Sequence, residues 1–185
     1  RGLGDVYKRQ MIKEDPAKAS EAFDELLKGK NKKNAFLLVE IGRAYLDQGK
    51  TAEAAEYAQR AKDINSKCAV AYLLSGDIAL NLNDVNKASS DYNQAIYLDE
   101  DCSEAYFKYA QVYKGVDPQL SLDMLMRLQS KTPEDNRISK ELADVYYTMG
   151  QYGKAKEAYE NYLKVGTPTE QDLSLIHISE PTRPY

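Results

Sequence analysis

A unit of 34 residues recurs along most of this 185-residue chain. Residues 35–68 align with residues 69–102 without a gap, and small and aromatic residues recur at matching positions. The matched pairs are Gly42 with Gly76, Tyr45 with Ala79, Ala54 with Ala88, Ala58 with Tyr92, Ala61 with Ala95 and Cys68 with Cys102. Within each unit the apolar residues are spaced three and four apart, which predicts amphipathic helices. The sequence therefore predicts an all-α fold, an alpha-solenoid of antiparallel helix pairs that bury their apolar faces on their neighbours.

The repeat divides the chain into segments of similar length. We expect a partial repeat with only its second helix at 11–34, whole repeats at 35–68, 69–102, 103–135 and 136–169, and the start of a truncated repeat at 170–172. The repeat at 103–135 is one residue shorter than its neighbours. Helix starts are predicted where an acid precedes a proline, as in Asp15-Pro16 and Asp117-Pro118, because the carboxylate caps backbone N–H groups and proline suits the first helical turn.

The two ends of the chain do not follow the repeat. Residues 1–10 read RGLGDVYKRQ and residues 173–182 read LSLIHISEPT. One DNA segment encodes the first peptide on one strand and the second on its reverse complement, in frame over all ten codons. We interpret 1–10 and 173–185 as translated sequencing adapter, to be excluded from fold reasoning. The remaining chain is more acidic than the whole, whose formal net charge is −4, and we expect the natural protein to extend beyond it at both ends.

The spacing of small residues, which recurs from repeat to repeat, resembles that of the tetratricopeptide repeat. The first helix of each unit carries an aliphatic residue, Gly or Ala and then Tyr or Ala, as in Ile41, Gly42 and Tyr45, and the second carries Ala, Tyr or Ala and Ala, as in Ala88, Tyr92 and Ala95. The period of 34 residues is that of this family. The family's usual Trp is replaced at the first anchor, where the chain has Leu38, Tyr72, Tyr106 and Ser139. The resemblance implies a right-handed superhelix of helix pairs and a protein that binds other proteins.

The sequence offers little for catalysis. Its one histidine, His177, falls in the excluded C-terminal segment, so His-dependent nucleophiles and His-ligated metals are not expected. We therefore predict a non-catalytic scaffold with no cofactor and no metal. The alternative is that this region belongs to a larger enzyme or signalling protein whose chemistry lies elsewhere. Nucleic acid is not an expected partner of an acidic chain, because phosphates would be repelled.

The predicted interaction surface is the concave wall formed by the first helices of the repeats. Helical spacing selects residues that point away from the packing anchors. They are Phe36, Val39, Arg43, Leu46, Val70, Leu73, Asp77, Leu80, Glu104, Phe107, Lys108, Gln111, Arg137, Lys140, Asp144 and Tyr147. The groove would be apolar toward its N-terminal end and charged toward its C-terminal end, which suits a peptide or an amphipathic helix of another protein. Alternatively, these residues pack against one another or against further repeats.

Three further features leave alternatives open. Lys28, Lys30, Lys32 and Lys33 form a basic run, which we interpret as a solvated turn rather than a phosphate site. Cys68 and Cys102 are expected to be unbonded linker residues, because stacked repeats are spaced too far apart for a disulfide. Self-association through the open repeat ends is possible. The chain is expected to be soluble, without a transmembrane segment, and either cytoplasmic or periplasmic.

Overall fold

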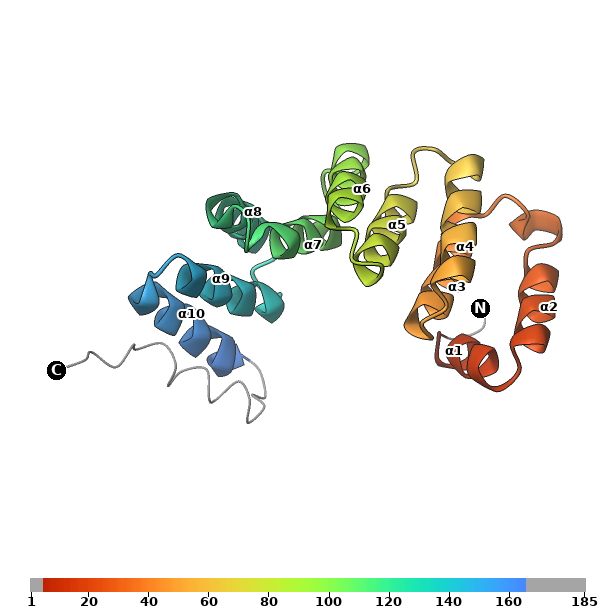
Figure 1. Cartoon of the computed structure of the whole chain (residues 1–185), viewed down its shortest axis with the longest axis horizontal. Helices are drawn as coiled ribbons and strands as arrows, with labels where there is room; N and C mark the ends of the chain where they lie inside the picture. The colour runs from red at the N-terminus through yellow and green to blue at the C-terminus, as the bar shows by residue number, and fades with distance from the viewer. Residues whose placement is uncertain (1–4, 166–185) are drawn as a thin grey trace. The chain divides into compact units, whose positions relative to one another are not determined.

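The computed structural model describes residues 5–165, within which the chain is entirely helical and contains no strand (Figure 1). Its elements are α1 (Asp5–Glu14), α2 (Pro16–Leu26), a short 3-10 helix η1 (Gly29–Asn31), α3 (Ala35–Asp47), α4 (Thr51–Ile64), α5 (Ala69–Asn81), α6 (Val85–Leu98), α7 (Ser103–Tyr113), α8 (Pro118–Lys131), α9 (Asn136–Thr148) and α10 (Tyr152–Val165). The predicted all-α fold of stacked helix pairs is confirmed. The predicted repeat start at 170–172 and the C-terminal adapter segment lie outside the described residues.

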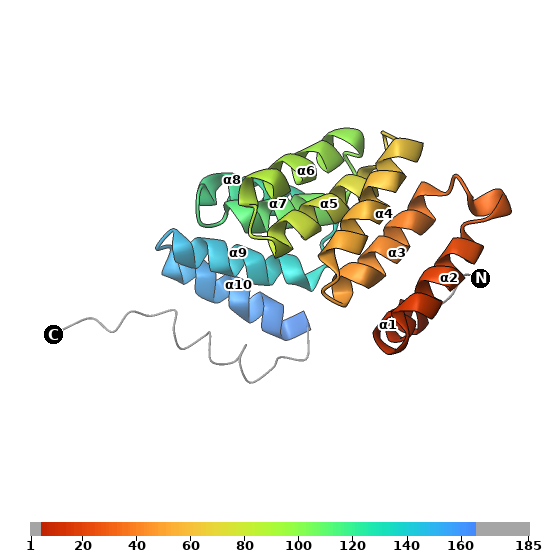
Figure 2. The same cartoon turned by 45° about the vertical axis from the view of Figure 1, so that its right-hand side comes forward.

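The helices pack as hairpins in two compact units. Among the described residues, unit 1 ends at Cys102 and unit 2 begins at Ser103. In unit 1, α3 packs against α4, α5 packs against α6, and α4 and α5 join the two hairpins, as the two views show (Figures 1 and 2). In unit 2, α7 pairs with α8, α9 pairs with α10, and α8 packs against α9. Each unit is therefore a short stack of antiparallel pairs, with two successive helices contributed by each repeat.

Polar caps and a left-handed turn residue set the helix ends. Asp15, Asp84 and Asp117 each accept a hydrogen bond from the backbone N–H three residues on, at 3.0–3.1 Å. Such caps typically contribute about 1 kcal/mol each. In the turn within the hairpin, Gly49 and Gly150 have φ of 71° and 73°, and Asn83 takes the equivalent position with φ of 60°. Asparagine tolerates this conformation better than most other residues with a Cβ atom, so the same turn forms in the repeat that has Asn83 instead of glycine.

Small residues allow the helices of a pair to approach closely. Ala54, Ala88 and Ala155 are fully buried at the same position of three second helices. A Cβ atom on Gly76 would lie 2.7 Å from Cδ1 of Tyr92, and one on Gly42 would lie 2.7 Å from Cδ2 of Leu74. Real Cβ atoms do not approach other heavy atoms this closely. The recurring glycine and alanine residues therefore mark the contacts between helices, as the spacing predicts.

The helix α1 crosses the boundary predicted after residue 10. It packs against α2 and α3. The side chain of Lys8 is 2% exposed, with its Nζ 3.1 Å from Oε2 of Glu40, and Nη2 of Arg9 lies 2.7 Å from Oδ2 of Asp47. These contacts show how residues 5–10 pack, but packing does not test the origin of the sequence. The interpretation of residues 1–10 as adapter therefore stays a prediction.

Candidate functional site

The predicted wall residues differ greatly in exposure. Phe36, Arg137 and Tyr147 are exposed, whereas Val39, Leu73 and Phe107 are buried. The remaining members are half-buried: Arg43, Leu46, Val70, Asp77, Leu80, Glu104, Lys108, Gln111, Lys140 and Asp144. The two units use these positions differently.

In unit 1 the wall is an apolar surface on α3 and α5. Phe36 stands in the first turn of α3 with 64% of its surface exposed, and Val70 occupies the matching position of the neighbouring helix α5. Val39 and Leu73 follow three residues later on the same helix faces and are buried. The surface therefore consists of an exposed phenyl ring on a packed aliphatic base. We call the face of α3 and α5 that carries Phe36, Val39, Val70 and Leu73 the unit 1 face.

In both units an aspartate of the first helix binds a tyrosine of the second. The hydroxyl of Tyr92 in α6 donates to Oδ1 of Asp77 in α5, at 2.7 Å. The hydroxyl of Tyr159 in α10 donates in the same way to Oδ1 of Asp144 in α9. Asp77 and Asp144 are members of the predicted groove, and the structure shows that they bind within their own helix hairpins. The carboxylates are therefore committed in part to holding each hairpin together.

The charged wall of unit 2 is largely paired with itself. Nζ of Lys114 lies 3.1 Å from Oε2 of Glu141 and 3.3 Å from Oδ2 of Asp144. Nε2 of Gln111 donates to Oε1 of Glu141 at 2.7 Å. Burial alone would lower the pKa of Lys114, but Glu141 and Asp144 outweigh it, so that the pKa is raised and the ammonium remains charged. This network ties α7 to α9.

A second set of contacts joins the first turns of the same helices. Nη2 of Arg137 lies 3.1 Å from Oε2 of Glu104 and 2.8 Å from Oδ2 of Asp135. Its guanidinium carbon lies 4.8 Å from the centre of the Phe107 ring, a cation–π contact that covers the ring. The hydrogen bond from Arg137 lowers the pKa of Asp135. At this end of unit 2, the arrangement matches the alternative in which wall residues bind one another.

Sequence reasoning did not identify the partners Lys114, Glu141 and Tyr159. One signal was present in the repeat alignment. Asp77 and Tyr92 are 15 residues apart, as are Asp144 and Tyr159, at equivalent positions of their repeats. The repeats without the tyrosine have Arg43 or Gln111 instead of aspartate. The co-occurrence of the two residue types predicts the hydrogen bond.

Replacing Tyr159 by phenylalanine tests this pair. At neutral pH we expect the free energy of unfolding to fall by about 1 kcal/mol, because the hydrogen bond is lost while Asp144 keeps Lys114. Burial and the bond to Asp144 raise the pKa of Tyr159. An unfolded tyrosine titrates near pH 10, so the native contribution is full below about pH 10 and is lost as the pH rises through the higher native pKa. Urea unfolding should therefore show a difference between the two proteins that shrinks in alkaline solution.

The control for this substitution is Tyr97→Phe, because Tyr97 is 79% exposed. Its free energy of unfolding should stay within about 0.5 kcal/mol of the wild type at every pH. Equal stability of Tyr159→Phe and the wild type at neutral pH would contradict the assigned role of the hydroxyl.

Within residues 7–164, whose side chains are described, no group of three His, Cys, Asp or Glu side chains is placed to hold a metal ion. Cys68 and Cys102 are not joined by a disulfide, as expected, and Cys68 is buried directly before α5. No helix in the described range combines the length and apolarity that crossing a bilayer requires.

Comparison with family models identifies the repeat. Two models, both described as tetratricopeptide repeat, match the chain, one over residues 12–67 and the other over residues 69–102 and 141–165. Together these segments make up more than half of the chain. No match was found among curated proteins.

Solved structures share the fold at low sequence identity. A crystal structure of MamA matches with a TM-score of 0.70 and 21% identity, covering 89% of this chain and 96% of that one. The Pseudomonas aeruginosa protein pilF matches with a TM-score of 0.74 and 14% identity, over 94% of this chain and 83% of its own. Cut9 with Hcn1, from an APC/C hetero-tetramer, gives 0.78 and 15%, over 95% of this chain and 35% of the other. At these identities the likeness shows the fold alone. The family models and the stacked hairpins together show that the chain belongs to the tetratricopeptide-repeat family.

Proposed function

We propose that this protein is a scaffold that binds an apolar segment of another polypeptide on the unit 1 face. The observation that carries the proposal is the exposure of Phe36 beside Val70, over the buried Val39 and Leu73. Proteins of the tetratricopeptide-repeat family typically mediate protein–protein interactions, and the chain belongs to that family. The contrast with unit 2, where Arg137 lies over Phe107, favours unit 1 as the binding surface.

The energetic argument rests on the exposed phenyl ring. Burial of apolar surface stabilises a complex by about 25 cal/mol per Å², and aromatic residues that enter a pocket often dominate binding. Most of the surface of Phe36 is exposed to water in the free protein. Its helix α3 is already packed through the buried Val39 on the same face. A partner could therefore cover the ring without reorganising the scaffold. An amphipathic helix or an extended segment with an aliphatic or aromatic anchor has the matching chemistry.

A random peptide library selected on the immobilised protein tests the proposal. We expect the selected peptides to share an aliphatic or aromatic anchor. Their affinity, measured by fluorescence anisotropy, should fall at least about tenfold on Phe36→Ala. Tyr97→Ala is the matched control, because it removes an aromatic ring that is also exposed but lies on α6. The proposal is contradicted if the peptides bind Phe36→Ala as tightly as the wild type but lose affinity for Tyr97→Ala. That result would place the binding surface on the second helices.

A further inference from the structure

A second surface arises where α2 ends early. The helix α2 has 11 residues, whereas the corresponding helix α4 has 14. Equivalent alanines show the register, since Ala19 and Ala54 are 35 residues apart instead of 34. The link to the next repeat therefore runs over residues 27–34, compared with residues 65–68 in the following repeat. A hollow lies between this link and the C-terminal end of α4.

The long link has a defined conformation. Gly29, with φ of 59°, begins the 3-10 helix η1. Nδ2 of Asn31 donates to the carbonyl oxygen of Leu26 at 2.9 Å, which caps the end of α2. Oδ1 of Asn34 accepts from the N–H of Leu37 at 3.1 Å and caps the start of α3. The side chains of the link are therefore presented by a backbone that is held at both ends.

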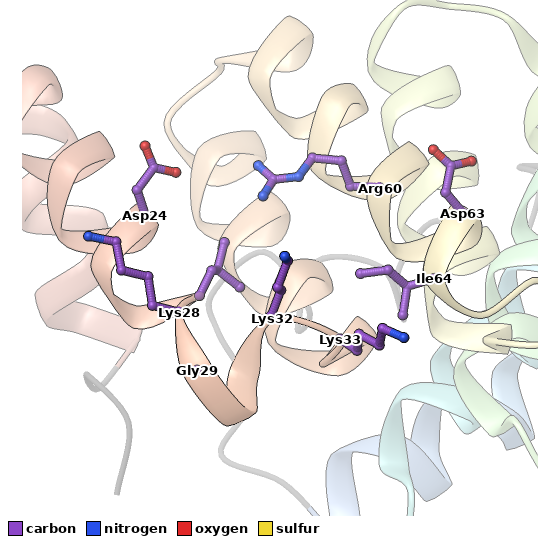
Figure 3. Close-up of a pocket in the computed structure, with 9 residues that line it drawn as sticks. Asp24, Lys28, Gly29, Lys32, Lys33, Arg60, Asp63 and Ile64 are labelled. Carbon is purple, nitrogen blue, oxygen red and sulfur yellow. The ribbon is translucent and has the colours of Figure 1, made fainter.

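The space between this link and α4 is about 630 Å³. Leu27 and Ile64 supply its apolar surface, and Ile64 is 39% exposed. In Figure 3, Ile64 points toward Lys32, whose ammonium group points toward Arg60. We call this space the link hollow; it is lined by Asp24, Leu27, Lys28, Gly29, Lys32, Lys33, Arg60, Asp63 and Ile64. Phe36 is not part of it, so the link hollow is separate from the residue that carries the proposed function.

The link hollow carries four cationic and two anionic side chains, in a chain whose net charge is −4. Lys28 is bound to Glu25, with Nζ 2.6 Å from Oε2, and this hydrogen bond raises the pKa of Lys28. Among residues 7–164, Lys32 and Lys33 have no carboxylate within ion-pair distance. Arg60 lies over the ring of Tyr57, with 4.9 Å between its guanidinium carbon and the ring centre. That contact uses the face of the guanidinium, and Nη1 of Arg60 lies 3.9 Å from Oε1 of Glu56 in an exposed ion pair. A carboxylate of a bound peptide would compete with Glu56 for the N–H edge of Arg60.

We propose that the link hollow binds an acidic peptide segment in which one apolar side chain is flanked by carboxylates. Leu27 and Ile64 would cover the apolar side chain, and Lys32, Lys33 and Arg60 would pair with the carboxylates. A nucleic acid fits less well, because Asp24 and Asp63 stand at the same rim and would repel a continuous row of phosphates. The basic run is thus a binding surface and not only a solvated turn.

A designed peptide tests this directly. We expect a fluorescein-labelled DDLDD peptide to bind in an anisotropy titration, and to bind at least about tenfold more tightly than DDADD or KKLKK. Affinity should fall as salt is raised, because the ion pairs are exposed. The double variant Lys32→Ala/Lys33→Ala should lose at least about tenfold in affinity, and Ile64→Ala should bind DDLDD no better than the wild type binds DDADD.

The controls separate the two proposed surfaces. Lys67→Ala, in the short link of the next repeat, should leave the affinity unchanged, and so should Phe36→Ala, which abolishes only the binding proposed for the unit 1 face. Far-UV circular dichroism will establish that each variant is folded. Equal binding of DDLDD and DDADD, or binding that survives the double lysine substitution, would overturn the proposal. So would tighter binding of a labelled oligothymidine, which would identify an unspecific site for polyanions.

Discussion

Replacing Gly76 by alanine should lower the free energy of unfolding by about 2 kcal/mol, because the added methyl group meets the buried ring of Tyr92. The ring cannot move aside easily. It is fully buried, and its hydroxyl is held by Asp77 at 2.7 Å. Helix propensity alone would make the alanine variant more stable by about 1 kcal/mol. A net loss of stability would therefore mean that the steric cost is larger than this gain. Urea unfolding followed by circular dichroism at 222 nm gives the measurement.

Gly153→Ala is the matched control in α10. A Cβ atom there would have no heavy atom within 4 Å, and the residue does not have a positive φ. The same chemical change should therefore raise the free energy of unfolding by about 0.5 kcal/mol through helix propensity alone. If both substitutions stabilise the protein, Tyr92 does not pack on Gly76 in the way described.

Replacing Ala88 by leucine should cost about 3 kcal/mol, since three further heavy atoms must enter a closed contact between α5 and α6. Ala88 is fully buried. It is equivalent to Ala54, whose carbonyl oxygen lies 3.3 Å from the position that a Cβ atom on Gly42 would take. Ala88 therefore occupies a position at which the two helices of a hairpin approach each other closely. We expect a lower midpoint of thermal unfolding and an unchanged helical spectrum at low temperature.

Ala52→Leu, at an exposed position in the first turn of α4, supplies the comparison. Its stability should stay within about 0.5 kcal/mol of the wild type, because the added atoms remain in water. Wild-type stability of Ala88→Leu would refute the placement of Ala88 between the helices.

The repeat period predicted the fold well because it reports packing directly. Gly42, Gly76, Ala54 and Ala88 recur since neighbouring helices pack so closely at these positions that a larger residue would meet buried atoms. Caps such as Asp15 and Asp117 were predictable for a similar reason, because each acts on backbone groups within three residues. In both cases the determining contacts are local or repeat with the chain.

The candidate site was less predictable because exposure depends on what covers a residue. Phe36, Val39 and Phe107 all satisfy the helical spacing of a concave wall, but Val39 is packed and Phe107 lies beneath Arg137. Spacing assigns a residue to a helix face and does not say which neighbour reaches across it. Whether the remaining surface binds a peptide stays a prediction.

The link hollow shows a different limit. The register shift between Ala19 and Ala54 is visible in the sequence, and so are the lysines of the link. The sequence does not show that α2 ends early, at Leu26. It also does not show that Ile64 and Arg60 line a hollow beside the link. The basic run taken alone predicts a solvated turn, because the apolar surface beside it belongs to another repeat.

The tyrosine–aspartate pairs also bear on the order in which the chain assembles. The two residues of each pair are about 15 positions apart in the sequence. Contacts between residues so close in sequence form rapidly during folding. The hairpins α5–α6 and α9–α10 can consolidate as soon as their second helix has been synthesised. The hairpins α3–α4 and α7–α8 have Ala58 and Leu125 in place of the tyrosine and cannot form this hydrogen bond. Alternate repeats would then act as the early folding units of the growing chain, and the repeats between them would complete the stack.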